Sequence, residues 1–103
     1  MCLFAGLLSS TAAPLDFARD IRPLLSDACY NCHGPDAKAR KAGLRLDDRA
    51  AAHDSVVLTN GEMLRRLTTT DPDERMPPLE SNRTLTDEQR AKLAQWLRAG
   101  AAW

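Results

Sequence analysis

The segment C29-Y-N-C-H33 (CYNCH) decides how this sequence is interpreted, because it gathers most of the chain's cysteine and histidine in one place. The 103-residue chain has three cysteines and two histidines, and two of those cysteines and one histidine fall in these five positions. Random placement of the same composition would give roughly 0.002 Cys-x-x-Cys-His segments in a chain of this length. Chance is therefore a poor explanation, and the spacing indicates a chemical function for these residues.

Cys-x-x-Cys-His is the attachment signature of a c-type haem. Two thiols three positions apart on a helical turn can each add across one vinyl group of the porphyrin, and the next residue then faces the iron. The sequence therefore predicts one covalently attached haem c, held by Cys29 and Cys32, with His33 as the proximal iron ligand. The other nitrogen of His33 needs a carbonyl partner, which we expect from the turn at Gly34 and Pro35.

Two other chemistries place cysteine and histidine at short spacing. A dithiol redox pair needs the βαβ context of a thioredoxin-like protein, which this sequence does not indicate. A structural zinc site with Cys29, Cys32, His33 and His53 as ligands would need two spaced ligand pairs, and the second pair is missing. His53 lies in the charged stretch DDRAAAHDS, where we expect a solvated surface residue. No zinc is therefore expected, and His53 is a poor candidate for an axial ligand.

Met76 is the residue that the sequence favours as the sixth ligand of the iron. It lies in the segment ERMPPLE, where Pro77 and Pro78 stiffen the backbone. A thioether on a rigid loop closes the second axial position and raises the reduction potential. Met63 is the rival, but its helical spacing with neighbouring leucines favours a place in the core. We therefore expect His33 and Met76 to be the axial pair.

Hydrophobic spacing predicts a mostly α-helical chain. Apolar residues at helical intervals predict a first helix that starts near Asp16 and that Pro23 kinks or restarts at Arg22. A capping box of Thr86 and Gln89 predicts the start of the last helix. The expected apolar faces of these two helices are Phe17, Ile21, Leu24 and Leu25 in the first, and Leu93, Trp96 and Leu97 in the second.

Between these two helices the sequence predicts one more helix and two long loops. Residues 56–67 match a helix that carries Met63 on its apolar face. Residues 34–43 and 68–84 are rich in turn-forming residues and predict loops. Loops of such length in a small domain usually carry function or are disordered.

The composition describes one small globular domain without a charge bias. Fourteen basic and fourteen acidic residues balance, which argues against binding to nucleic acid. The first 13 residues, MCLFAGLLSSTAA, look like the end of a secretory signal peptide and are too short to span a membrane. We therefore expect a single domain over residues 14–103, in a periplasmic or secreted location.

Three segments together resemble the planctomycete-type cytochrome c domain. They are DFARDIRPLLSDACYNCHGPDAKARKAGLRLD (16–47), TDPDERMPP (70–78) and LTDEQRAKLAQWLRAGAAW (85–103). The resemblance spans about residues 15–103. It implies a small class I-like cytochrome c fold, in which the N- and C-terminal helices pack across each other beside one covalently bound haem.

The resemblance also implies roles for individual residues. It carries Cys29 and Cys32 over as haem attachment, His33 as proximal ligand and Met76 as distal ligand. One departure from the family is that the segment 47–64 is shorter than usual, which implies a more exposed haem edge. Members commonly stand at the N-terminus of large secreted proteins, so a downstream enzyme domain in a longer protein is one possible context.

These patterns predict a monohaem c-type cytochrome that transfers single electrons outside the cytoplasm. We expect a monomeric electron carrier, or an electron-transfer domain, that serves a redox partner protein and has no catalytic residue of its own. The alternative belongs to another class of protein. If Met76 does not bind the iron, the open distal site would suit a haem-based sensor or a peroxide-reducing haem protein.

Overall fold

The computed structural model describes residues 15–103, so the expected signal-peptide remnant and Cys2 lie outside the described residues. The described elements are all helical: η2 (Phe17–Ile21, a π-helix), α1 (Arg22–Ala28), α2 (Arg49–Asp54), α3 (Glu62–Thr68), η3 (Leu79–Ser81, a 3₁₀ turn) and α4 (Asp87–Arg98). Residues 15–103 contain no strand. The prediction of a mostly α-helical chain is confirmed. In this part of the chain no helix is long and apolar enough to cross a membrane.

The first helical segment changes its hydrogen-bonding pattern where proline was expected to interrupt it. Asp16 caps η2 by accepting a hydrogen bond from the backbone N–H of Arg19. The π-helix then gives way to α1 at Arg22, and Pro23 stands in the first turn of α1, where a missing N–H costs little. The prediction of a restart at Arg22 is confirmed. Continuous helical backbone therefore leads directly to Cys29.

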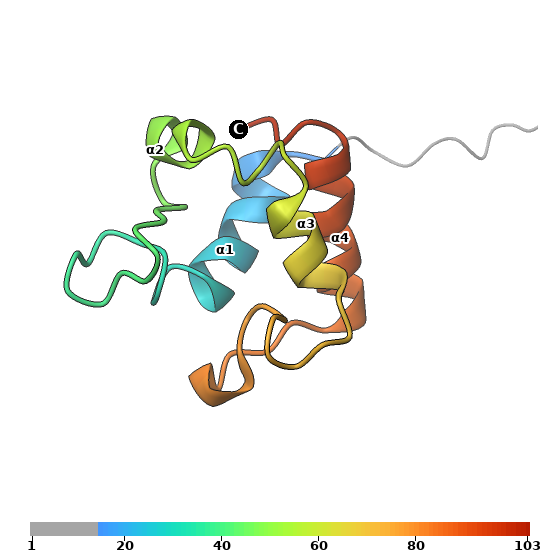
Figure 1. Ribbon diagram of the computed structural model, residues 1–103. Coiled ribbons are helices and arrows are strands. Elements are labelled where there is room, and N and C mark those ends of the chain that lie inside the picture. Colours follow the sequence, from blue (N-terminus) through green and yellow to red (C-terminus); the bar gives the residue numbers. More distant parts are fainter. Residues whose placement is uncertain (1–14) are drawn as a thin grey trace, which may run out of the picture.

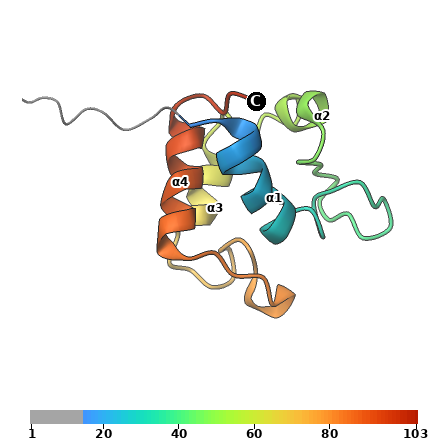
Figure 2. The same ribbon diagram turned by 180° about the vertical axis from the view of Figure 1, so that it is seen from behind.

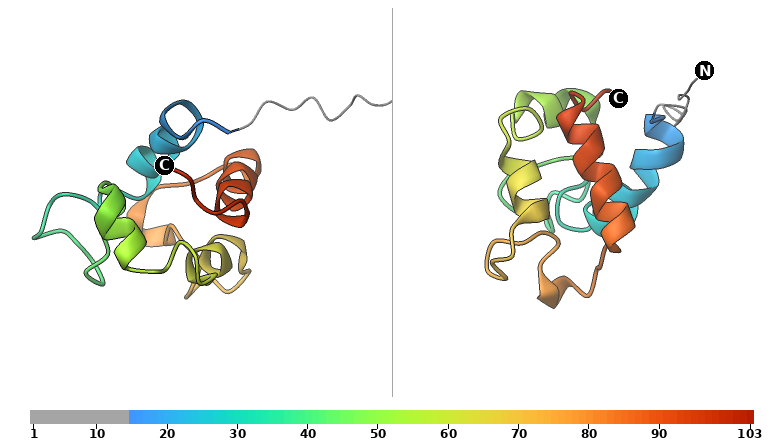
Figure 3. Two further views of the ribbon diagram at one scale, coloured as in Figure 1. Left: turned by 90° about the horizontal axis from the view of Figure 1, so that it is seen from above. Right: turned by 90° about the vertical axis from the view of Figure 1, so that its right-hand side faces the viewer.

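The last helix begins and packs as the sequence predicts. Thr86 accepts a hydrogen bond from the backbone N–H of Gln89, and the Gln89 side chain accepts one from the backbone N–H of Thr86. The stripe of Leu93, Trp96 and Leu97 is buried. Figure 3 shows α4 crossing the first helical segment, and Figure 1 shows α3 lying along α4.

Aromatic rings close the core at one end of the helices. Phe17 of η2 lies with its ring centroid 5.7 Å from that of Trp96 in α4 and 4.1 Å from that of Trp103. The indole nitrogen of Trp96 donates a 2.7 Å hydrogen bond to the carbonyl of Ala102, which holds the C-terminal residues against the helix. This aromatic corner joins η2, α4 and the chain end through ring contacts and the hydrogen bond from Trp96.

The middle of the chain departs from the prediction of one helix over residues 56–67. The helix α3 begins only at Glu62, because Gly61 before it has a φ of +90° and Val56 has a φ of +59°. A short unpredicted helix, α2, precedes this turn. Its first turn is capped by Asp48, whose carboxylate accepts from the backbone N–H of Ala51.

The position of His53 in α2 corrects a second expectation. His53 is half-buried, and its ring meets the edge of Trp103 at a centroid distance of 5.9 Å. The expectation of a solvated surface histidine is therefore wrong. The predicted loops are present on either side of these helices. Residues 34–48 and the segment around η3 extend away from the helices, as seen from the front in Figure 1 and from behind in Figure 2.

Candidate functional site

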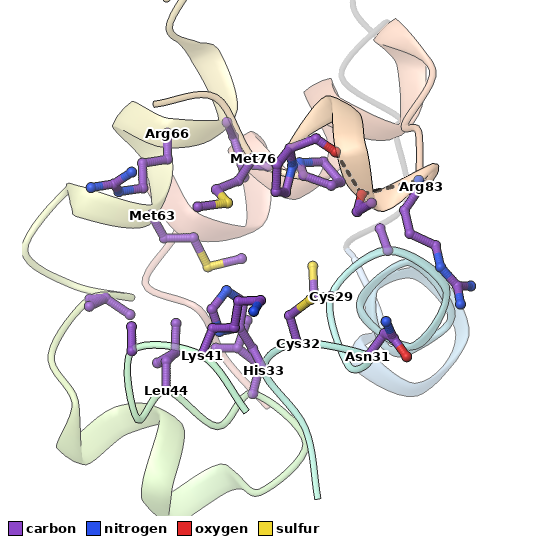
Figure 4. A pocket seen from close by; sticks show the side chains of 18 of the residues that line it. Cys29, Asn31, Cys32, His33, Lys41, Leu44, Met63, Arg66, Met76 and Arg83 are labelled. Carbon is purple, nitrogen blue, oxygen red and sulfur yellow. Dashed lines mark hydrogen bonds between the residues drawn. The ribbon is translucent and has the colours of Figure 1, made fainter. Parts of the chain in front are cut away.

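A cavity of about 550 Å³ lies between α1, the start of α3 and the two long loops. Its size is typical of a site for a small molecule or cofactor. The wall contains sulfur and imidazole side chains from three separate parts of the chain (Figure 4). These side chains belong to Cys29, Cys32, His33, Met63 and Met76. All four sequence-predicted site residues thus line one cavity, together with a fifth that was assigned to the core.

The Cys-x-x-Cys-His segment forms an irregular turn that continues from α1. The backbone N–H of Cys29 donates to the carbonyl of Leu25 at 2.8 Å, and that of His33 donates to the carbonyl of Cys29 at 2.8 Å. Gly34 is required directly after the motif, because a Cβ at this position would lie 2.2 Å from the carbonyl oxygen of Tyr30. The turn therefore packs Gly34 against the backbone of Tyr30 inside the motif.

The loop after the motif folds back and holds it from the other side. Lys41 and Leu46 donate backbone hydrogen bonds to the carbonyls of Cys32 and His33, each at 2.7 Å. Residues 34–46 therefore close around the motif, and Leu46 itself is buried. The same loop supplies several residues to the cavity wall, including Lys41 and Leu44.

The turn after the motif does not supply the expected partner for His33. The carbonyls of Gly34 and Pro35 both accept hydrogen bonds from the guanidinium of Arg40, at 2.9 and 3.2 Å. The Nδ1 atom of His33 is buried and has no hydrogen-bond partner among the described residues. The expectation that this turn orients the imidazole is therefore wrong.

Burial controls the protonation of the motif's side chains. Burial lowers the pKa of His33, against an opposing effect of the backbone at Lys41 and Leu44, so the neutral ring that a metal requires is favoured. Burial raises the pKa of the Cys29 thiol to about 12. A thiol that stays protonated is a poor redox nucleophile, which disfavours a dithiol redox pair.

The backbone of Met76 is held on both sides of the residue. Its N–H donates to the carbonyl of Arg66 in α3 at 3.0 Å, and its carbonyl accepts from the guanidinium of Arg90 in α4 at 2.9 Å. Glu74, two residues before Met76, forms an ion pair with Arg65, and its carbonyl accepts a hydrogen bond from the guanidinium of Arg66. The loop is thus attached to both neighbouring helices, with the Met76 side chain at the cavity (Figure 4).

Met63 has a different position from the one that helical spacing predicted. It is the second residue of α3, is only partly buried and packs at the edge of the core. It also lines the cavity, on the side from which Met76 approaches (Figure 4). The assignment to the core was incomplete, because a residue in the first turn of a helix can contact both the core and the site.

Polar and apolar residues complete the wall around the donor groups. The charged residues Lys41, Glu62, Arg66 and Arg83 also line the cavity, and the guanidinium of Arg66 forms an ion pair with Glu62 at 2.8 Å. From residues 47–64, Ser55 and Val57 line the wall in addition to Glu62 and Met63. His53 is not among the lining residues.

The donor groups fit a covalently attached haem. Two cysteines follow a helix directly, a neutral half-buried imidazole comes next in sequence, and thioethers reach the same cavity from another segment. These are the groups that attach haem and bind its iron in c-type cytochromes. The class of protein that the helical fold and this site define is a small haem-binding domain.

The planctomycete cytochrome C family model matches residues 29–80, which is half of the chain, and the chain belongs to this family. No curated protein and no solved structure gives a significant match. The matched range begins at Cys29 and includes Met76, but it leaves α1 and α4 outside. Family membership indicates haem-based electron transfer and a covalently bound haem.

Proposed function

We propose that this chain is a monohaem c-type cytochrome that transfers single electrons outside the cytoplasm, with His33 and Met76 as axial ligands. The observation that carries the proposal is the meeting of Cys29, Cys32, His33 and Met76 at one cavity. These residues come from two segments that are far apart in the sequence. A class I-like arrangement is supported by the packing of η2 against α4 through Phe17 and Trp96.

Each part of the site has a distinct task in this proposal. A bound haem supplies an iron that accepts and returns one electron. The two thiols hold the ring in place, and burial keeps His33 in the neutral form that binds iron. The loop contacts of Met76 present its thioether on a backbone held from both sides. Apolar residues of the wall suit contact with a porphyrin ring; they include Ala28, Leu44, Leu46, Val57 and Leu67.

The acidic residues near Met76 fit a structural role better than an acid–base one. The Asp71 carboxylate accepts a 2.9 Å hydrogen bond from the backbone N–H of Asp73, which forms a turn. Both residues are exposed, and neither lines the cavity. We therefore assign the chain to electron transfer rather than catalysis, as a monomeric carrier or as a domain of a longer protein, with a separate redox partner protein.

The proposal is tested on holoprotein exported together with a c-type haem maturation system. We expect a low-spin spectrum in both redox states and the weak far-red band of methionine ligation in the ferric state. Met76→Ala is expected to abolish the band and to let carbon monoxide bind the ferrous protein readily. Met63→Leu is the matched control and is expected to keep the band.

The other outcomes would separate the remaining possibilities. Loss of the band in Met63→Leu but not in Met76→Ala would assign the sixth ligand to Met63. A high-spin wild-type spectrum would contradict axial ligation by His33 and Met76, and would favour a haem-based sensor or a peroxide-reducing protein. A protein that acquires no haem would contradict the proposal as a whole.

A further inference from the structure

Arg90, in the first turn of α4, joins two segments that are distant in sequence. Its Nη1 atom donates a 2.7 Å hydrogen bond to the carbonyl of Leu67 and a 2.9 Å hydrogen bond to the carbonyl of Met76. Leu67 belongs to the last turn of α3, where carbonyls lack partners within the helix. One guanidinium nitrogen therefore gives the Leu67 carbonyl at the end of α3 a hydrogen-bond partner and also holds the backbone of Met76.

The surroundings of Arg90 indicate that it is placed there for these carbonyls rather than for an ion pair. No carboxylate accepts a hydrogen bond from its guanidinium in residues 15–103, and its Nε atom is buried without a partner. Burial and the nearby Arg75 lower its pKa, although Asp87 opposes this effect. A partly buried cation without a carboxylate is costly, so its two carbonyl contacts must offset that cost.

The backbone of Met76 is held by two hydrogen bonds, one at its N–H and one at its carbonyl. The N–H of Met76 is already held by the carbonyl of Arg66 in α3. With the Met76 carbonyl held by α4, the backbone on both sides of the Met76 Cα is fixed relative to the cavity. A rigid backbone restricts the places that the thioether can reach.

We propose that Arg90 is a positioning residue that sets the thioether of Met76 at the haem iron by donating to the carbonyls of Met76 and Leu67 together. This inference rests on the proposed function, because it takes Met76 as the sixth ligand. It adds a residue of α4, outside the matched range of the family, to the determinants of the axial ligand. If the donors of Arg90 are removed, we expect Met76 to be displaced from the iron more easily.

The test uses three substitutions in the holoprotein. Arg90→Met keeps the aliphatic bulk but removes every donor, and Arg90→Lys keeps the charge on a shorter side chain. Arg75→Met is the matched control, because it removes a neighbouring cation for which the structure gives no side-chain hydrogen bond. The measurements are the far-red band as a function of pH and the binding of carbon monoxide to the ferrous protein, on samples matched for haem content and helical circular dichroism.

We expect Arg90→Met to lose the far-red band at a lower pH than wild type. It should also bind carbon monoxide about tenfold more tightly, which corresponds to losing one charged hydrogen bond. Arg90→Lys should fall between Arg90→Met and wild type, because its shorter side chain cannot serve both carbonyls fully. Arg75→Met should match wild type.

An Arg90→Met protein with wild-type ligation would overturn the inference, provided that Met76→Ala abolishes the band in parallel. If Met76→Ala keeps the band, the proposed axial pair fails instead, whatever Arg90 does. Should Arg90→Met not accumulate as folded holoprotein, Arg90→Lys carries the test, and wild-type behaviour of Arg90→Lys overturns the inference. An equal effect of Arg75→Met would assign the change to lost charge and would also overturn it.

Discussion

The aromatic corner and the cavity side of this protein are held together by different kinds of interaction. At the corner, the rings of Phe17, Trp96 and Trp103 pack on one another, and Leu93 in the same hydrophobic core is completely buried. At the cavity side, the loops 29–48 and 69–86 are held by backbone hydrogen bonds and by arginine side chains that reach carbonyls. Apolar burial dominates the first region and directional polar contacts dominate the second.

The two kinds of interaction contribute different properties: apolar burial stabilises the fold, and hydrogen bonds position the groups of the site. The free energy gained by apolar burial is roughly proportional to the buried area and has little directional preference. It therefore stabilises the helices without fixing the position of any one atom. Hydrogen bonds fix distances and angles, so they can present an imidazole or a thioether at a defined point. We therefore expect substitutions in the two regions to produce separable effects.

The largest effect is expected from removing the attachment points on the cavity side. Cys29→Ala with Cys32→Ala eliminates both thiols that can form thioether bonds, so no covalently held haem should remain after acid-acetone extraction. Wild-type holoprotein treated in the same way should stay coloured. Coloured protein in the double variant after extraction would show that haem attachment does not depend on these cysteines.

A large effect on stability, without a change in ligation, is expected from the helical side. Leu93→Ala removes a side chain that is 0% exposed and should lower the free energy of unfolding by about 2–5 kcal/mol. Leu79→Ala is the matched control, because Leu79 is 77% exposed and its loss should change stability by less than about 0.5 kcal/mol. Denaturant unfolding of the holoproteins provides the measurement.

The two regions would not be separable if Leu93→Ala changed the far-red band of the folded protein. The comparison therefore needs spectra taken well below the unfolding transition. Under those conditions we expect the Leu93→Ala spectrum to match wild type. A high-spin spectrum would mean that packing in the core directly controls the axial ligand.

The smallest effect concerns an ion-pair group at the start of α3. The guanidinium groups of Arg65 and then Arg66 hold the pKa of Glu62 at about 2, below its ordinary value of 4.5. A carboxylate with a lowered pKa contributes stability above the ordinary value, and this contribution is lost as the pH falls toward the lowered one. Glu62 is only partly buried, so solvent screens the ion pair and the contribution is small.

The Glu62→Gln variant tests this pH dependence. We expect its thermal midpoint to lie slightly below that of wild type at neutral pH. The difference should shrink below pH 4.5 and disappear near pH 2. A difference that is constant over this range would show that the ion pair is not its source, and would shift attention to the contact of Glu62 with the cavity.

Agreement between the sequence and the structure is best where the signal is local. The capping box at Thr86 and the restart at Arg22 depend on neighbouring residues, so both could be predicted. Of the helix predicted over residues 56–67, only the part from Glu62 onward forms, as α3, because the apolar spacing continues through a turn with positive φ at Val56 and Gly61. The helix α2 was missed because its run of alanines carries no amphipathic pattern.

For the site, the sequence was enough to select Cys29, Cys32 and His33, because their chemistry depends on contiguous spacing. Met76 could also be selected, from the proline-rich loop around it. Whether a thioether reaches the cavity depends on where α3 begins, and that start depends on backbone torsions at residues far from the motif. Only the tertiary structure therefore brought Met63 to the cavity wall and Arg90 to the Met76 carbonyl, since both contacts join segments whose separation in sequence hides their proximity in space.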